Sequence, residues 1–334
     1  MGRRERLLSG QDATERMVAA SRAVFVGLIA VFGVAALVGA TPPLEVQSLV
    51  YLALMVGISL PHGGFEHVAN LRGRGESFQV RYLGAYLLLV AASAGLFVVA
   101  PVAGLAVALA VTALKGGFGG VRVLETTADA DHLDGLRVLG ALVRGGAVVV
   151  VPLVYHPGIY YMVASYMVGL FDSGALAAVR WAFELPARTA LSGGYHLAAF
   201  AYLGAGLARA DSLSGWAADA RETLLLIAYF AVVPPIVAIG VYFPFWYASR
   251  QVARLTAAGR GDLGAALWRV ARGAPLPWLG ALAVLVGVWL LVPNPPASAV
   301  GWAALYSVFV AVIAVPHVVV GSWLDRRQGI WSAA

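Results

Sequence analysis

The chain has 334 residues, of which 60% are hydrophobic and only 12% are charged. A soluble domain usually has about 25% charged residues, because its surface must stay solvated. The mean hydropathy of +0.82 therefore excludes a soluble enzyme and predicts a multi-pass membrane protein. The chain contains no cysteine, which excludes disulfides, iron–sulfur clusters and thiolate metal sites. The formal net charge of +6 does not indicate nucleic-acid binding, because basic residues in a membrane protein first report its topology.

Ten apolar segments follow one another along the chain, and we expect them to be transmembrane helices. They cover residues 23–40, 44–60, 82–99, 102–114, 139–154, 158–171, 190–208, 222–247, 278–292 and 297–319. Several are shorter than the roughly 20 residues of a straight span, and the segments 102–114 and 158–171 could instead be re-entrant or interfacial. Pro234 and Pro235 predict a kink in the segment 222–247. The predicted fold class is an all-α, polytopic membrane helix bundle with about ten transmembrane helices (8–10), located in the cell membrane.

The distribution of basic residues predicts the orientation of the bundle. With the N-terminus inside, the inner segments carry 20 of the 23 basic residues, and the outer loops carry only Arg209 and Arg221. Because inner loops are enriched in Lys and Arg, both termini are expected to be cytoplasmic. We expect a cytoplasmic tail over residues 1–22, one transmembrane domain over 23–320 and a second cytoplasmic tail over 321–334.

Polar residues at the inner ends of several predicted spans indicate a possible site. The predicted topology gathers His62, Lys115, His196, Tyr247, Gln251 and His317 near one depth. Ionisable groups inside a membrane are costly, so their clustering favours a functional site, although helix ends at the water boundary often carry polar residues. His132 and His156 fall in a loop and on the outer side, and we expect them to be ordinary structural residues.

Two short motifs resemble the Brp/Blh family of β-carotene 15,15′-dioxygenases. One is Pro61-His62-Gly63 after an early span, and the other is Val315-Pro316-His317-Val318 followed by Trp323-Leu324-Asp325. The resemblance covers roughly residues 45–330. It implies a multi-pass membrane protein that cleaves β-carotene at its central double bond with O₂, giving two retinals. It also implies a non-haem Fe(II) held by four histidines, and imidazole with open coordination positions suits that chemistry.

The resemblance places the four ligand positions on residues of this chain. The first position, in the Pro-His-Gly motif, matches His62. The second, in a His-aromatic-Gly pattern, falls on Lys115. The third and fourth, a His-x-x-x-His pattern after an aromatic run, fall on Tyr247 and Gln251. No His-x-x-x-His occurs anywhere in the chain, so three of the four expected ligands are replaced.

The replaced positions predict weak or absent iron binding. A lysine ammonium repels Fe(II), and Tyr and Gln are weaker ligands for it than imidazole. Iron would be retained only if His67, His196 and His317 converged with His62 as substitute ligands. The sequence assigns no catalytic or substrate-binding residue beyond this set.

Three functions are open at this point. The chain could cleave β-carotene to retinal with a rearranged iron site, or bind β-carotene or retinal without cleaving it. It could also be a structural or partner-binding membrane protein. Lys115, the only lysine, has three corresponding interpretations: a side chain that reaches the lipid headgroups, a cation at the iron position, or an amine that condenses with retinal.

Overall fold

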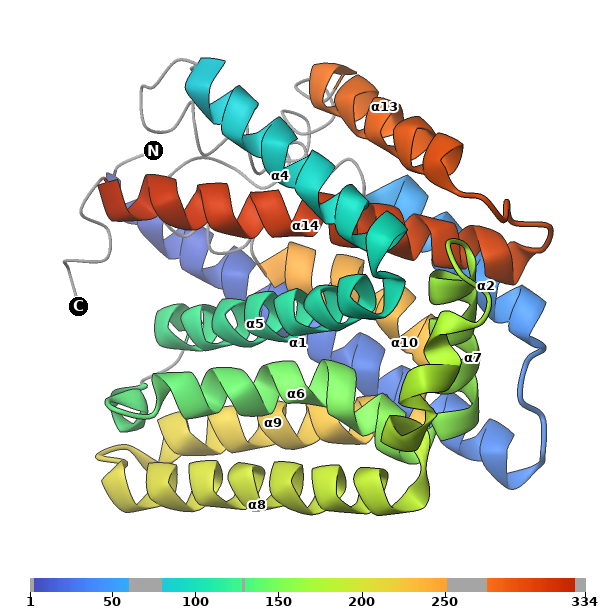
Figure 1. Cartoon of the computed structure of the whole chain (residues 1–334). Helices are drawn as coiled ribbons and strands as arrows, with labels where there is room; N and C mark the ends of the chain where they lie inside the picture. The colour runs from blue at the N-terminus through green and yellow to red at the C-terminus, as the bar shows by residue number, and fades with distance from the viewer. Residues whose placement is uncertain (1–2, 60–79, 128–129, 251–274, 328–334) are drawn as a thin grey trace.

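The computed structural model describes residues 3–59, 80–127, 130–250 and 275–327. All regular secondary structure in these ranges is helical, which confirms the predicted all-α class. Figure 1 shows most helices running roughly along one direction, with α7 lying across one end of the bundle.

Eleven α-helices lie in the described residues. They are α1 (Arg3–Leu37), α2 (Leu44–Leu54), α4 (Val80–Val99), α5 (Pro101–Thr127), α6 (Arg137–Tyr155), α7 (Pro157–Gly169), α8 (Leu185–Arg209), α9 (Leu213–Val232), α10 (Pro235–Val241), α13 (Pro275–Leu291) and α14 (Ala299–Arg327). Two π-helical segments, η1 (Met55–Ser59) and η4 (Tyr242–Ala248), continue α2 and α10. Two short 3₁₀ segments, η2 (Asp131–Leu133) and η3 (Ala175–Phe183), precede α6 and α8.

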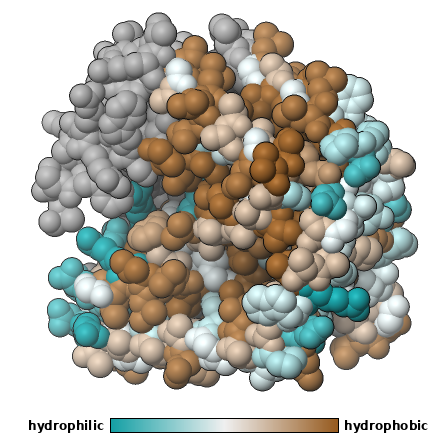
Figure 2. Space-filling model, viewed as in Figure 1, coloured by the Kyte–Doolittle hydropathy of each residue, from teal (hydrophilic) through white to brown (hydrophobic). Residues whose placement is uncertain are grey.

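Within the described residues, four helices are long and apolar enough to cross a membrane. These are Glu15–Leu37, Pro101–Glu125, Arg137–Tyr155 and Ala299–Val319, and shorter apolar helices accompany them. Large apolar side chains are also exposed, including Leu88 and Leu290 at 71% each. Figure 2 shows apolar side chains in a broad band over the visible face, with hydrophilic ones mainly toward its edges. Such a surface is expected of a multi-pass protein in lipid.

The segment 222–247, predicted as one kinked span, is two helices. Helix α9 ends at Val232, and Val233 is extended (φ −81°, ψ 131°). The next helix, α10, begins at Pro235. A proline has no N–H for the helical ladder and pushes the preceding residue out of the helical region, so Pro234 and Pro235 together stop α9.

The chain then reverses direction instead of bending. The ring of Phe230 lies 5.4 Å from that of Tyr242, and Glu222 pairs with Arg250 at 2.9 Å. These two pairs fit an antiparallel helical hairpin formed by α9 and the continuous stretch of α10 and η4. The prediction of a single span here is wrong.

Helix α7, which corresponds to the predicted segment 158–171, lies across the bundle end (Figure 1). Its 13 residues rise only about 20 Å, less than the thickness of a hydrocarbon core. The backbone N–H of Asn294, in the connection between α13 and α14, donates to the carbonyl of Leu170 just after α7 (3.1 Å). These observations favour the re-entrant or interfacial alternative for this segment.

Helix α5 is longer than the predicted segment 102–114, and Lys115 lies in its interior. The reason is a close contact with α6, which lies beside it in Figure 1. A Cβ atom on Gly117 would overlap the carbonyl of Ala141, and one on Gly145 would overlap that of Ala113. Small residues at such a contact let two helix backbones approach, which offsets the weak helix propensity of glycine.

An aromatic core joins α1, α9 and η4. The ring of Phe25 stacks on Tyr229 at 3.7 Å and on Trp246 at 4.6 Å. All three rings are buried. This core fixes the end of the hairpin that carries η4 against the first helix of the chain.

Candidate functional site

Two π-helical segments lie against each other where the resemblance places the metal ligands. Segment η1 ends three residues before His62, and η4 contains Tyr247. The two segments are in contact, although they are far apart in the sequence. Single-turn π-helical stretches are rare and occur frequently at functional sites. Their contact therefore defines a candidate site at this end of the bundle.

Lys115 and Tyr247 face each other at this site. The Nζ atom of Lys115 lies 5.3 Å from the centre of the Tyr247 ring, within range of a cation–π interaction. Both side chains are half-buried. The interior position of Lys115 in α5 differs from the expected helix end open to water. The structure thus brings together two of the positions at which the resemblance expects ligands.

Glycines on α5 set the distance between α5 and η4. A Cβ atom on Gly116 would lie 2.8 Å from the hydroxyl of Tyr242, and one on Gly120 would lie 3.5 Å from the guanidinium of Arg144. A side chain at residue 116 would push α5 away from η4, whereas the 3.5 Å distance at residue 120 is an ordinary contact with α6. Gly116 therefore allows the approach of Lys115 to Tyr247.

His317 lies on a helix that packs beside α5. It is half-buried in α14, which contacts α2, α4 and α5. Helix α14 continues through Pro316, and the hydroxyl of Tyr86 in α4 donates to the carbonyl of Ile313 at 3.4 Å. His317 therefore lies on a helix that packs against α5, the helix that carries Lys115.

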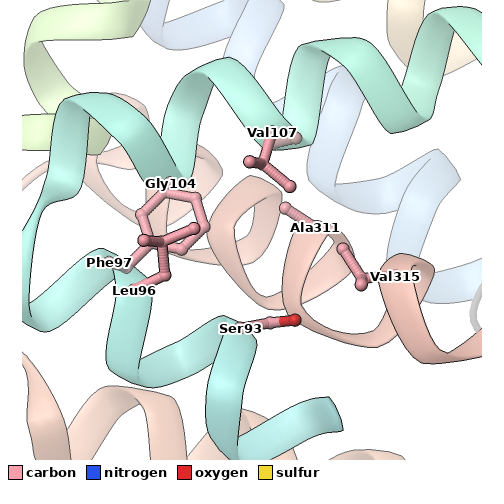
Figure 3. Close-up of a pocket in the computed structure, with 8 residues that line it drawn as sticks. Ser93, Leu96, Phe97, Gly104, Val107, Ala311 and Val315 are labelled. Carbon is pink, nitrogen blue, oxygen red and sulfur yellow. The ribbon is translucent and has the colours of Figure 1, made fainter.

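A small apolar hollow lies farther along the same helices. Its lining comes from α4, α5 and α14: Ser93, Leu96, Phe97, Gly104, Val107, Ala108, Ala311 and Val315. Figure 3 shows the ring of Phe97 close to Gly104, with Val107, Ala311 and Val315 nearby. Val315, which lines the hollow, precedes His317 by two residues in α14.

His196 is not brought to Lys115 and Tyr247. Its Nδ1 atom lies 2.8 Å from the carbonyl of Ser192, and its ring packs edge-on against Tyr195, both on its own helix α8. Figure 1 shows α6 between α8 and α5. The described part of the site therefore does not include His196.

The described residues do not fit the four-histidine iron site that the resemblance implies. His62, His67 and Gln251 lie outside the described residues, so their roles stay predictions. Among the described residues, no group of three or more His, Asp or Glu side chains is arranged to hold a metal ion. The two expected ligand positions that are described present an ammonium and a phenol. No reaction step through iron can be derived from them.

A buried charge network lies beside this site, and the sequence analysis missed it. Arg144, 1% exposed, donates to Asp219 at 2.6 Å. Asp219 also accepts a hydrogen bond from Tyr202 and lies 3.0 Å from the Nε2 atom of His132. His132, expected to be an ordinary loop residue, is 1% exposed. These contacts join η2, α6, α8 and α9.

Glu222 is the second acidic member of the network. It pairs with Arg22 at 2.8 Å, with Arg250 at 2.9 Å and with Arg144 at 3.2 Å. Arg22 is 37% exposed, whereas Arg144 and Arg250 are buried. Buried ion pairs need such partners, because an unpaired buried charge is strongly destabilising.

Two signals in the sequence could have indicated the network. Arg144 interrupts an apolar segment, and an intramembrane arginine needs an acidic partner. Asp219 and Glu222 are three residues apart, which places them on one face of a helix. The predicted topology had put Asp219 in an outer loop and Arg250 at the far end of one long span. Only the reversal of the hairpin brings Arg250 back to Glu222.

Comparison with known proteins decides the family. The family model of beta-carotene 15,15'-dioxygenase matches residues 53–325, most of the chain. This chain belongs to the Brp/Blh family of β-carotene 15,15′-dioxygenases. The match confirms the resemblance predicted from Pro61-His62-Gly63 and the motif around His317.

Relatives from Halobacterium salinarum support the Brp/Blh assignment. The probable beta-carotene 15,15'-dioxygenase Brp, from strains R1 and NRC-1, is 45% identical over 93% of this chain and 92% of its own length. The probable beta-carotene 15,15'-dioxygenase Blh from strain NRC-1 is 35% identical over 99% of this chain and its own full length. No solved structure matches this chain.

Proposed function

We propose that this Brp/Blh homologue binds β-carotene or its cleavage product retinal inside the cell membrane, at the site around Lys115 and Tyr247. The contact between these two side chains carries the proposal. The resemblance assigns both residues to one site from distant parts of the sequence, and their contact fits that assignment. The family match supplies β-carotene as the ligand class.

Weak or absent cleavage follows from the same pair. Imidazole ligands favour Fe(II), whereas an ammonium at a ligand position repels it. The ammonium of Lys115 and the phenol of Tyr247 do not replace two imidazole ligands of Fe(II). The chain therefore holds the carotenoid or retinal and cleaves β-carotene poorly.

The family reaction itself is the second candidate function. It is favoured by the 45% identity to a protein named probable beta-carotene 15,15'-dioxygenase. In that case β-carotene is cleaved by O₂ to retinal, and His62 needs substitute iron ligands. His67 and His317 are the candidates, since His196 is directed to its own helix.

The membrane arrangement proposed with this function has ten crossings and cytoplasmic termini. Helix α7 is removed from the predicted set, and the hairpin of α9 with α10 and η4 adds one crossing. Arg180 in η3 and Arg188 in the first turn of α8 then lie on the outer side, and Arg209 at the end of α8 lies on the inner side. Arg221 falls within α9, and the basic residues stay strongly concentrated on the inner side.

The test is pigment and metal analysis of the full-length chain purified from β-carotene-producing cells. Brp from Halobacterium salinarum, prepared in parallel, is the comparison. We expect β-carotene or retinal to copurify with this chain, with iron far below one atom per chain and retinal formation below that of Brp. Stoichiometric iron with retinal formation would establish the second candidate. Absence of both pigment and retinal formation would overturn the carotenoid proposal.

A further inference from the structure

The two halves of the candidate site rest on the same buried charge network. Tyr247 lies in η4, and Arg250 follows it after one helical turn. Lys115 lies in α5, and Gly120, farther along α5, packs against Arg144. Arg144 and Arg250 both pair with Glu222. A shift in this network would therefore change the position of η4 relative to α5.

Arg250 has the contacts expected of an anchor for η4. Its guanidinium carbon lies 3.4 Å from the centre of the Trp246 ring, and its Nε atom donates to the hydroxyl of Ser21 at 2.9 Å. Its Nη1 atom lies 2.9 Å from Glu222. The side chain is only 2% exposed. Arg250 thus ties the end of η4 to α1 and α9.

A π-helical stretch needs such external support. Its wider turn has poorer packing than an α-helix and is uncommon without a specific reason. The continuous stretch of α10 and η4 is held at one end by the Pro234–Pro235 turn and at the other by Arg250. Because Tyr247 lies between these two ends, its ring direction depends on both.

We propose that Arg250, anchored by Glu222, is a positioning residue that holds η4 so that Tyr247 faces Lys115. This role rests on the proposed function, which places the ligand site at that pair. Arg250 acts through η4 and does not itself take part in binding.

The single lysine of the chain gives a direct measurement of this geometry. An amine-reactive ester labels Lys115 in the detergent-purified full-length chain, and digestion with mass spectrometry separates it from the N-terminal amine. The ester reacts with the neutral amine, and the Tyr247 ring stabilises the charged one. In Arg250→Gln we expect Lys115 to react about fivefold faster, which corresponds to the loss of about 1 kcal/mol of cation–π interaction.

Arg250→Gln is chosen because it leaves Glu222 paired with Arg22 and Arg144. The matched control is Arg137→Gln, which removes the same charge from the exposed Arg137–Glu125 pair and should leave the labelling rate unchanged. A folded Arg250→Gln variant that labels at the wild-type rate would overturn the proposal. So would a rise of equal size in Arg137→Gln.

A milder variant covers the case in which Arg250→Gln does not fold. Ser21→Ala removes only the hydroxyl that accepts from Arg250. We expect labelling of Lys115 to rise by roughly twofold, and an unchanged rate would overturn the proposal. Labelling needs no carotenoid, so a failure of this inference is distinct from a failure of pigment binding.

Discussion

Lys115 differs most clearly from the residue that the resemblance leads us to expect at its position. Its ammonium faces a phenol ring at a position where the resemblance expects an imidazole. A cation–π contact keeps a positive charge at the place where a metal ion would otherwise supply one. We propose that the single lysine acts as an internal cation of the site.

Restoring the three expected imidazoles should restore a metal site. We expect Lys115→His/Tyr247→His/Gln251→His to bind substantially more iron than the wild type, because four imidazoles including His62 are then available. Metal analysis of the purified variant measures this. Lys115→Arg is the control and should stay at the wild-type level. An unchanged iron content in the triple variant would show that these positions are not the ligand positions.

The charged state of Lys115 also predicts its behaviour toward retinal. A Schiff base needs the neutral amine as nucleophile, and the Tyr247 ring stabilises the ammonium. After incubation with retinal and borohydride reduction, we expect mass spectrometry to find no adduct on the wild-type chain. An adduct that is present in the wild type and lost in Lys115→Arg would contradict this prediction.

At this scale the sequence predicted part of the site. Lys115 and Tyr247 could be paired because short motifs fix their positions relative to the family. Glu222 and Arg250 could not be paired, because their contact depends on which way the chain turns after Val232. His132 appeared to be a loop residue because its acidic partner lies on another helix.

Among the helices, the contact between α5 and α6 fixes the position of the site. Glycines of each helix face backbone atoms of the other, so neither helix can move apart without losing the contact. The apolar segments predicted both helices, but they placed the end of α5 at residue 114. The low helix propensity of Gly116 and Gly117 favoured a helix end there, but packing against α6 keeps these residues helical.

The glycine contact gives a stability prediction. Gly117→Ala places a methyl group into the carbonyl of Ala141 and should lower the free energy of unfolding by about 1–3 kcal/mol. The control is Gly193→Ala in α8, where nothing lies within 4 Å of the added carbon. That change should be neutral or slightly stabilising. Thermal unfolding in detergent measures both, and equal melting temperatures would contradict the prediction.

For the whole molecule, ten segments are predicted from the sequence and ten crossings are proposed from the structure, but the two sets are not the same. One predicted segment is the transverse helix α7, and another is the hairpin of α9 with α10 and η4. In the proposed arrangement these two differences cancel in the count and in the side of the C-terminus. The distribution of basic residues does not detect these differences, because it stays strongly inner-sided in both arrangements.

Single cysteines distinguish the two topologies, since the natural chain has none. We expect Ser173→Cys to react with a membrane-impermeant maleimide in intact cells and Asp211→Cys to react only after lysis. The positive-inside topology derived from the sequence alone predicts the reverse. A reporter fused after Ala334 should give a cytoplasmic signal in both cases, and it controls for the orientation of the whole chain.

The hairpin also determines the order in which the chain can enter the membrane during synthesis. Helix α9 carries Asp219, Arg221 and Glu222, and a charged residue at the centre of an isolated span costs about 2.5–3.5 kcal/mol to insert. Arg144 is already made when α9 emerges, whereas Arg250 is not. A nascent chain that stops before Arg250 therefore has α9 only partly paired, and we expect the hairpin to insert as one unit when its second arm is complete.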